Sequence, residues 1–235
     1  MEQLIFELAT PEPPSFANFL PGPNREAVAV LAGFASGQAA ETGLVLWGPP
    51  GAGKTHLLLA TAAAAQGVRP VHVSAGPEAV PADPPEPSAL MLVDDADRAD
   101  AAAQGRLFTL YNALKATGGS LIATAAVPPA RMPLREDVRS RLGWGLVFEV
   151  LPLADEDKPA ALVTYARSRG FALADDVIAY LLAHGRRDMP TLVATLAALD
   201  RYSLASKRPI TMPLLKDWMQ RGLGFSGQAS PDLPR

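Results

Sequence analysis

The sequence predicts an α/β fold, in which helices cover both faces of a mainly parallel β-sheet, followed by a smaller unit built only of helices. Short apolar runs rich in β-branched residues alternate with longer helix-forming runs as far as residue 150, which is the pattern of repeated strand–helix units. Beyond that point, helical runs follow one another without strands. We therefore expect a sheet-containing domain over 21–150 and a helical domain over 151–221.

The first domain is expected to begin with a turn at 21–25 and a helix at 25–36, in which Val28, Leu31 and Phe34 recur at helical spacing. Apolar β-branched runs predict the strands, and the longer runs between them predict helices. The strands are expected at 44–47, 71–75, 89–93, 120–125 and 146–150, and the helices at 55–66, 104–116 and 134–142. Five prolines between residues 76 and 88 predict a surface loop, because proline interrupts regular structure.

The second domain is expected to contain helices at 155–169, 175–184, 188–205 and 213–220. Asp155 is predicted to cap the first of them, and Pro190 fits the third because proline is tolerated in a first helical turn. Two segments flank the domains. Prolines predict an extended arm over 1–20, and a composition rich in Gly, Ser and Pro predicts a disordered tail over 222–235.

A glycine-rich segment, Gly48-Pro-Pro-Gly-Ala-Gly-Lys-Thr55, joins the first expected strand to the helix after it. This is a complete G-x-x-x-x-G-K-[ST] phosphate loop in its required context. Its glycines allow backbone N–H groups to surround an anion, and the start of the helix adds a positive field. Lys54 supplies a charge for the β- and γ-phosphates, and the Thr55 hydroxyl suits Mg²⁺. The sequence therefore predicts a nucleotide site here.

Two acids, Asp94 and Asp95, directly follow the apolar strand at 89–93. The carboxyl ends of parallel strands are where α/β sheets place ligands. A carboxylate at this point can hold the water shell of Mg²⁺, and its neighbour can orient an attacking water. The spacing after the phosphate loop therefore predicts a Walker B pair. Thr124, near the exit of the strand at 120–125, is placed where it could touch the same site.

The composition excludes several other classes of site. The chain of 235 residues contains no cysteine, which excludes disulfides, thiolate metal sites and cysteine nucleophiles. Its net charge of −3 gives no overall basic field for nucleic acid, and its three histidines lack metal-ligand spacing. No run approaches the length of a membrane span, and the first residues lack the features of a signal peptide. We therefore expect a soluble, cytoplasmic protein.

Two features are each open to two interpretations from the residues alone. The peptide Gln3-Leu-Ile-Phe-Glu-Leu8 is either a strand added to a sheet edge, which spacing alone favours, or a docking peptide for a pocket on another protein. Arg141, just before the turn Gly143-Trp-Gly145, is either a solvated cation at a helix end or a finger presented to a neighbouring molecule's nucleotide. Spacing does not decide between the two interpretations of Arg141.

Several motifs in combination give residues 1–220 a resemblance to a known family. They are Phe16-Ala-Asn-Phe-Leu-Pro-Gly-Pro-Asn24, the phosphate loop, Leu-Val-Asp94-Asp95, Pro128-Pro129 after a strand, and Ser140-Arg-Leu-Gly-Trp-Gly145. The chain resembles the AAA+ superfamily, within it the bacterial initiator DnaA, and more closely the Hda family of DnaA-related regulatory inactivators. The resemblance implies an αβα nucleotide domain with a small helical lid.

The resemblance implies ADP or ATP and Mg²⁺ as cofactors, and DnaA and the DNA polymerase III sliding clamp as partners. It replaces the edge-strand interpretation of the N-terminal peptide by a clamp-docking one, through Gln3, Leu4, Phe6 and Leu8. It makes Arg141 an arginine finger acting in trans on ATP held by DnaA, beside Asp94 and Asp95 as the chain's own catalytic acids. Thr55 and Asp94 are the implied Mg²⁺ residues. The implied nucleotide contacts are Gly48, Pro49, Pro50, Gly51, Ala52, Gly53, Lys54, Thr55, His56 and Asn24.

The chain also departs from the family pattern at two places. Ala125 and Ala126 stand where a strand usually leads to a polar sensor residue, and Pro190 stands where the lid helix usually carries a sensor arginine. Both predict a protein that holds nucleotide, ADP in particular, more than it turns ATP over. Because no basic helix-turn-helix follows the lid, we expect no sequence-specific DNA binding; a monomer and a homodimer are both compatible with the sequence. The alternative function is an ATP-hydrolysing loader of a helicase or another ring.

Overall fold

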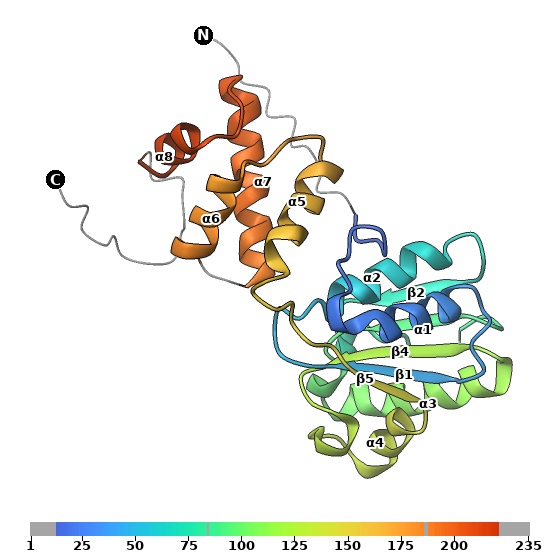
Figure 1. Ribbon diagram of the computed structural model, residues 1–235. Helices are drawn as coiled ribbons and strands as arrows, with labels where there is room; N and C mark the ends of the chain where they lie inside the picture. The colour runs from blue at the N-terminus through green and yellow to red at the C-terminus, as the bar shows by residue number, and fades with distance from the viewer. Residues whose placement is uncertain (1–12, 84, 186–187, 221–235) are drawn as a thin grey trace, which may run out of the picture. The chain divides into compact units, whose positions relative to one another are not determined.

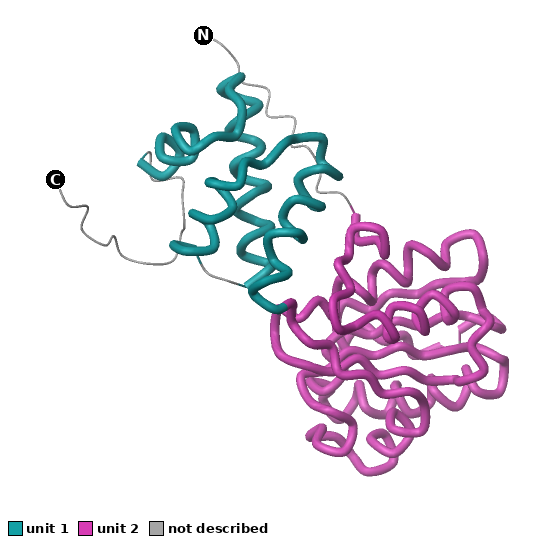
Figure 2. Tube along the Cα trace, viewed as in Figure 1, with its two compact units in different colours: residues 1–12, 154–235 teal, residues 13–153 magenta. Residues whose placement is uncertain are grey.

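The computed structural model describes residues 13–83, 85–185 and 188–220. The chain divides into two compact units, one spanning Pro13–Leu153 and the other containing Ala154–Arg235 (Figure 2). Each unit has a hydrophobic core of its own, as expected of separately packed domains.

A five-stranded parallel sheet forms the centre of the larger unit (Figure 1). Its strands are β1 (Gly43–Trp47), β2 (Val71–Ser74), β3 (Leu90–Val93), β4 (Ser120–Ala125) and β5 (Leu146–Glu149). They lie in the order β2-β3-β4-β1-β5, and every neighbouring pair runs parallel. Parallel neighbours need crossover connections, which place helices on the faces of the sheet. The predicted α/β fold with a mainly parallel sheet is confirmed.

Helices pack against both faces of this sheet. They are α1 (Arg25–Ala35), α2 (Lys54–Ala65), α3 (Ala101–Thr117) and α4 (Glu136–Gly143). Figure 1 shows α1 and α2 on one side and α3 and α4 on the other. Side chains of β1 alternate between the two cores: Leu44 and Leu46 face the core of α1 and α2, whereas Val45 faces that of α3 and α4. The strands β3 and β4 are buried throughout, which explains the uninterrupted apolar run of β3.

Short 3₁₀ turns interrupt the connections of the larger unit. They are η1 (Gly22–Asn24), η2 (Pro77–Ala79), η3 (Ala96–Arg98) and η4 (Pro129–Arg131). The start of α3 differs from the expectation, because the helix begins at Ala101 and not at residue 104. The Asp100 carboxylate caps it by accepting a hydrogen bond from the Ala103 N–H (2.7 Å). The alanines of this first turn favour helix without showing apolar periodicity, so the pattern alone did not reveal them.

In its described residues, the smaller unit is built of helices. They are α5 (Lys158–Ser168), α6 (Asp175–His184), α7 (Met189–Ser206) and α8 (Met212–Gln220). Leucines from all four helices pack with Trp218 into one core. The expected helix start at residue 155 was wrong, since α5 begins at Lys158 with Pro159 in its first turn. Pro190 likewise lies in the first turn of α7. Among the helices of the described ranges, none combines the length and apolar character needed to cross a membrane.

Candidate functional site

The phosphate loop connects the end of β1 to the start of α2 and needs glycine at its tightest points. Gly48, Gly51 and Gly53 all have positive φ angles, of 152°, 79° and 101°. A Cβ on Gly48 would lie 2.4 Å from the carbonyl oxygen of Val150, and one on Gly53 would lie 2.8 Å from the ring of Phe19. Glycine is therefore required at Gly48 and Gly53, because a side chain there would collide with neighbouring protein atoms, and the positive φ angles keep the backbone in the turn that a phosphate loop needs.

The ammonium group of Lys54 lies over this loop. Its Nζ donates to the carbonyl oxygens of Gly48 (2.8 Å) and Pro49 (3.1 Å). Burial lowers the pKa of Lys54, and the charges of Asp95 and Asp94 oppose that shift. The predicted phosphate-binding lysine and the predicted acid pair thus lie within electrostatic reach of each other.

Hydrogen bonds from two threonines hold the Asp94 carboxylate. The Thr55 hydroxyl donates to Asp94 Oδ2 (2.8 Å), and the Thr124 hydroxyl donates to Asp94 Oδ1. Thr124 also accepts a hydrogen bond from the Asp95 N–H (2.9 Å). Thr124 lies on β4, the strand next to β3, and is fully buried. Its hydroxyl therefore holds the residues that directly follow β3 in place. The structure thereby brings together four of the residues that the sequence placed near this site, Thr55, Asp94, Asp95 and Thr124.

Asp95 and Asp97 form the remainder of the acidic edge. Asp95 adopts a left-handed backbone conformation (φ 50°) and pairs with the exposed Arg98 (3.2 Å). Asp97 was missed by sequence reasoning; its Oδ2 accepts a hydrogen bond from the Ala126 N–H (3.1 Å). Its Oδ1 is buried and has no hydrogen-bond partner among the described residues. The sequence does contain this third acid two residues after the pair Asp94 and Asp95. It lies beside the end of β4, where the chain has Ala126 and no polar sensor residue.

Asn24 and His56, two of the implied nucleotide contacts, make other contacts in the structure. The Asn24 amide bonds both backbone groups of Leu151, through Nδ2 to the carbonyl (2.8 Å) and Oδ1 to the N–H (2.9 Å). His56 Nε2 lies 3.1 Å from the Ser15 carbonyl, and its ring lies 5.3 Å from that of Phe19. Burial lowers the pKa of His56, and the Ser15 hydrogen bond opposes this. Their roles in nucleotide binding stay predictions.

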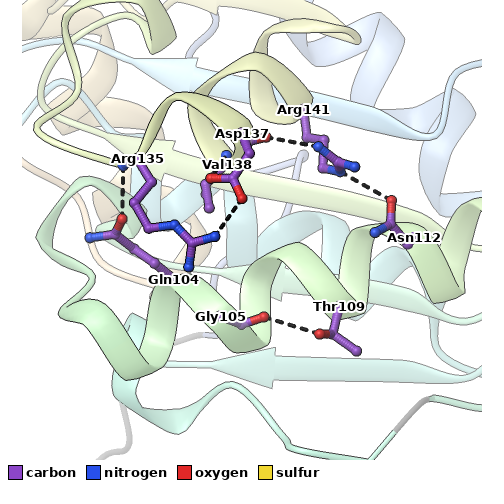
Figure 3. A network of polar contacts seen from close by, with 8 residues as sticks. All are labelled: Gln104, Gly105, Thr109, Asn112, Arg135, Asp137, Val138 and Arg141. Atoms are coloured by element: carbon purple, nitrogen blue, oxygen red, sulfur yellow. Dashed lines mark hydrogen bonds and ion pairs between the residues drawn. The ribbon is translucent and has the colours of Figure 1, made fainter.

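Arg141 lies in the last turn of α4, with its guanidinium held against α3 (Figure 3). Its Cζ is 3.7 Å from the centroid of the Phe108 ring, close enough for a cation–π contact. Its Nε donates to Asn112 Oδ1 (3.0 Å), and its Nη1 donates to the Asp137 carbonyl (3.1 Å). The guanidinium therefore has a defined orientation on the surface of the larger unit, and its role as a finger stays a prediction.

An exposed tryptophan adjoins this arginine. Trp144 is 59% exposed, with Lys115 Nζ 5.1 Å from its ring centroid and Arg141 Cζ at 5.5 Å. Tyr111 meets the same ring edge-on at 6.3 Å between centroids. This face combines Arg141 with an exposed tryptophan, two residue types that are enriched at protein interfaces.

The implied clamp contacts Gln3, Leu4, Phe6 and Leu8 lie outside the described residues, so their role stays a prediction.

A parallel sheet with this strand order, a phosphate loop after β1, an acid pair after β3 and a separate helical unit are the features of the AAA+ fold. Domain III of DnaA from Thermotoga maritima matches with a TM-score of 0.72 at 19% identity, covering 88% of this chain and 97% of that one. AMPPCP-bound DnaA from Aquifex aeolicus matches with a TM-score of 0.66 at 19% identity, covering 89% and 69%. The Thermotoga maritima RuvB Holliday junction branch migration motor matches with a TM-score of 0.67 at 18% identity, covering 89% and 72%.

At such identities the structural likeness establishes the fold. The helical unit shows a more specific similarity, because residues 155–219 match the family described as Hda, lid domain. The chain therefore has the AAA+ fold, with a helical unit similar to the Hda lid domain and a fold similar to that of DnaA domain III.

Proposed function

We propose that this protein is a negative regulator of DNA replication initiation that binds ADP or ATP with Mg²⁺, docks on the sliding clamp and stimulates ATP hydrolysis by DnaA. The observation that carries the proposal is the guanidinium of Arg141, oriented by Phe108 and Asn112 on a protein whose lid matches that of Hda. An arginine supplied to a bound triphosphate stabilises the charge of the transferring phosphoryl group.

The nucleotide is proposed to bind to the loop 48–53, whose glycines with positive φ allow backbone N–H groups to turn toward phosphate oxygens. Lys54 would exchange its carbonyl partners for phosphate oxygens, since both are acceptors for an ammonium group. Thr55 and Asp94 offer the oxygen donors that Mg²⁺ prefers. In the part of the chain that the structure describes, no group of three or more His, Asp or Glu side chains is arranged to hold a metal, which fits an ion held by few protein ligands plus phosphate.

The protein's own turnover of ATP is proposed to be weak. The carboxyl end of β4 offers Ala125 and Ala126, which have no polar side-chain atom to contact a phosphate or a water. Pro190, in the first turn of α7, carries no charge for a phosphate. Nucleotide held in the loop would then have a structural role, with ADP as the expected resident.

The direct test uses the unmodified protein. DnaA loaded with radiolabelled ATP is mixed with the clamp on DNA, and formation of ADP is followed with and without this protein. We expect acceleration of hydrolysis that depends on both the clamp and this chain. Equal rates with and without the protein, under conditions in which it binds nucleotide, would overturn the proposed function.

The second candidate function is an ATP-hydrolysing loader of a helicase or another ring. The hydrogen bond between Thr55 and Asp94 favours it, because the two residues proposed for Mg²⁺ lie in contact. ATP hydrolysis by the purified protein in the absence of DnaA distinguishes the two. Turnover of about 1 s⁻¹ or more, in the usual range of enzymes, would support the loader.

Clamp docking is tested by substituting the N-terminal peptide. We expect the double substitution Gln3→Ala with Leu4→Ala to weaken clamp binding by about 30-fold or more, because the loss of even one anchor residue of an interface costs about 2 kcal/mol or more. Binding is measured by surface plasmon resonance with immobilised clamp. Glu2→Ala, next to the peptide, is the matched control. If the unmodified chain shows no binding, the clamp is not a partner.

Thr124 provides a test of the Mg²⁺ site. We expect Thr124→Val to reduce the gain in nucleotide affinity caused by Mg²⁺ by about tenfold, because a hydrogen bond to a charged group contributes about 1.5–3 kcal/mol. Valine keeps the shape of threonine but releases Asp94 and the Asp95 N–H. Fluorescent ADP is titrated with Mg²⁺ and again with EDTA, and Thr124→Ser should restore the gain. The same Mg²⁺ effect in the valine variant and the wild type would contradict this role.

A further inference from the structure

The buried side chain of Gln104 links two parts of the larger unit that are distant in sequence (Figure 3). Gln104 lies near the start of α3 and is 8% exposed. Its Nε2 donates to the Ala99 carbonyl (2.8 Å), and its Oε1 accepts from the Arg135 N–H (2.8 Å). Ala99 directly follows η3, in the segment that leaves the acid pair, and Arg135 immediately precedes α4. One amide therefore joins the exit of the acidic edge to the helix that carries Arg141.

The helix α4 depends on its neighbours for its position. It has 8 residues, fewer than the roughly 12–15 that make an isolated helix even marginally stable. Its buried side chains are Val138 and Leu142, and no side chain caps its N-terminus from the N-cap position. The ion pair of Arg135 and Asp137 at this end is largely exposed and so holds it weakly. Gln104 thus supplies a buried polar anchor at the start of α4.

One side of α3 contacts both ends of α4: the start through Gln104 and the last turn through Arg141. Gln104, Phe108 and Asn112 follow one another at intervals of four residues, which places them along one side of the helix. Phe108 and Asn112 receive the guanidinium of Arg141. Arg141 lies about 9 Å beyond Arg135 along the axis of α4, so a tilt at the Gln104 end would move the guanidinium away from these contacts.

We propose that Gln104 is a positioning residue for Arg141. By fixing the start of α4, it keeps the guanidinium in the orientation needed to act on nucleotide held by a partner. The catalytic consequence rests on the proposed function, whereas the anchoring of α4 does not. The Nε2 of the same amide donates to the Ala99 carbonyl. Gln104 therefore also connects the segment after the acid pair with α4, the helix that carries Arg141.

The substitution Gln104→Met tests the proposal, since methionine is similar in length and shape but makes neither hydrogen bond. In the full-length protein we expect hydrogen exchange of the amides at 135–141 to rise about tenfold, with those of β1 and β4 unchanged. Maximal stimulation of ATP hydrolysis on DnaA should fall about tenfold, because a misplacement of about 1 Å has large effects on rate. The concentration for half-maximal stimulation should change little, because the contact surface is retained.

Two further variants separate positioning from a general loss of structure. Gln104→Glu retains the acceptor for the Arg135 N–H but loses the donor to the Ala99 carbonyl, so we expect it to restore part of the protection and part of the stimulated rate. Thr109→Ala, on the same helix, removes an exposed hydroxyl that bonds only the Gly105 carbonyl (3.1 Å; Figure 3), and both measurements should match the wild type.

Unchanged exchange of α4 in Gln104→Met would overturn the proposal. Faster exchange with an unchanged stimulated rate would also overturn it, since Gln104 would then be structural without positioning Arg141. If the wild-type protein does not stimulate hydrolysis at all, the proposed function has failed, whereas the exchange measurement still decides whether Gln104 anchors α4.

Discussion

Replacing Arg141 by alanine is expected to lower the stimulated rate of ATP hydrolysis on DnaA by about 10³-fold, the lower end of what an arginine finger contributes. The physical reason is the loss of a planar cation that stabilises charge on the phosphoryl oxygens during transfer. The measurement is single-turnover hydrolysis of ATP bound to DnaA, with clamp on DNA and saturating protein. Saturation separates the chemical effect from weaker association.

The matched control is Arg139→Ala, which removes one positive charge from the same helix. We expect it to change the stimulated rate less than about threefold, because a partly exposed charge affects association more than chemistry. Arg141→Lys keeps the charge but loses the planar fork that contacts Asn112 and the Asp137 carbonyl, so it should recover only a small part of the rate. Full stimulation by a folded, nucleotide-binding Arg141→Ala variant would exclude the finger mechanism.

The sequence was sufficient for the fold and for the proximity of Thr55 and Asp94. Alternating strands and helices predicted the parallel sheet, and the phosphate loop and the acid pair predicted that Thr55 and Asp94 would lie at one edge of it. These predictions succeed because each depends on residues that are near in sequence or at the same ends of parallel strands. In the structure, Thr55 bonds Asp94 directly (2.8 Å).

The contacts that the sequence did not reveal are those that join distant segments through one side chain. Asn24 bonds both backbone groups of Leu151, and Gln104 bonds the Arg135 N–H. Neither side chain belongs to an apolar periodic pattern, and the partner of each is a backbone group that any residue would offer. Such pairs depend on how helices are placed on the sheet, and local spacing does not contain that information.

The smaller unit contains another contact of this kind, a buried ion pair between Arg169 and Asp200. Their side chains are 7% and 8% exposed. Both Nε and Nη2 of Arg169 donate to Asp200 Oδ2, each at 3.1 Å. Arg169 follows the last residue of α5, and Asp200 lies in α7, so the pair fixes these two helices to each other.

We expect Asp200→Ala to destabilise the smaller unit by about 3–5 kcal/mol, because it leaves the buried guanidinium without its counter-charge. The chain has two units and need not unfold in a single step, so the free energy is measured by hydrogen exchange of amides in α5 and α7. Arg208→Ala is the control: it breaks a more exposed pair with Asp217 (3.0 Å; 47% and 28% exposed). Its expected cost is below about 1 kcal/mol.

A second variant distinguishes the cost of a lost partner from the net value of the pair. Replacing both residues, Arg169→Met with Asp200→Leu, removes the two charges together and fills the space with apolar groups. Such replacements are often neutral or stabilising, by up to about 4 kcal/mol, so exchange in α5 and α7 should return to about the wild-type rate. If the double variant is as unstable as Asp200→Ala, the pair itself contributes net stability, and the penalty of an unpaired buried charge is not the explanation.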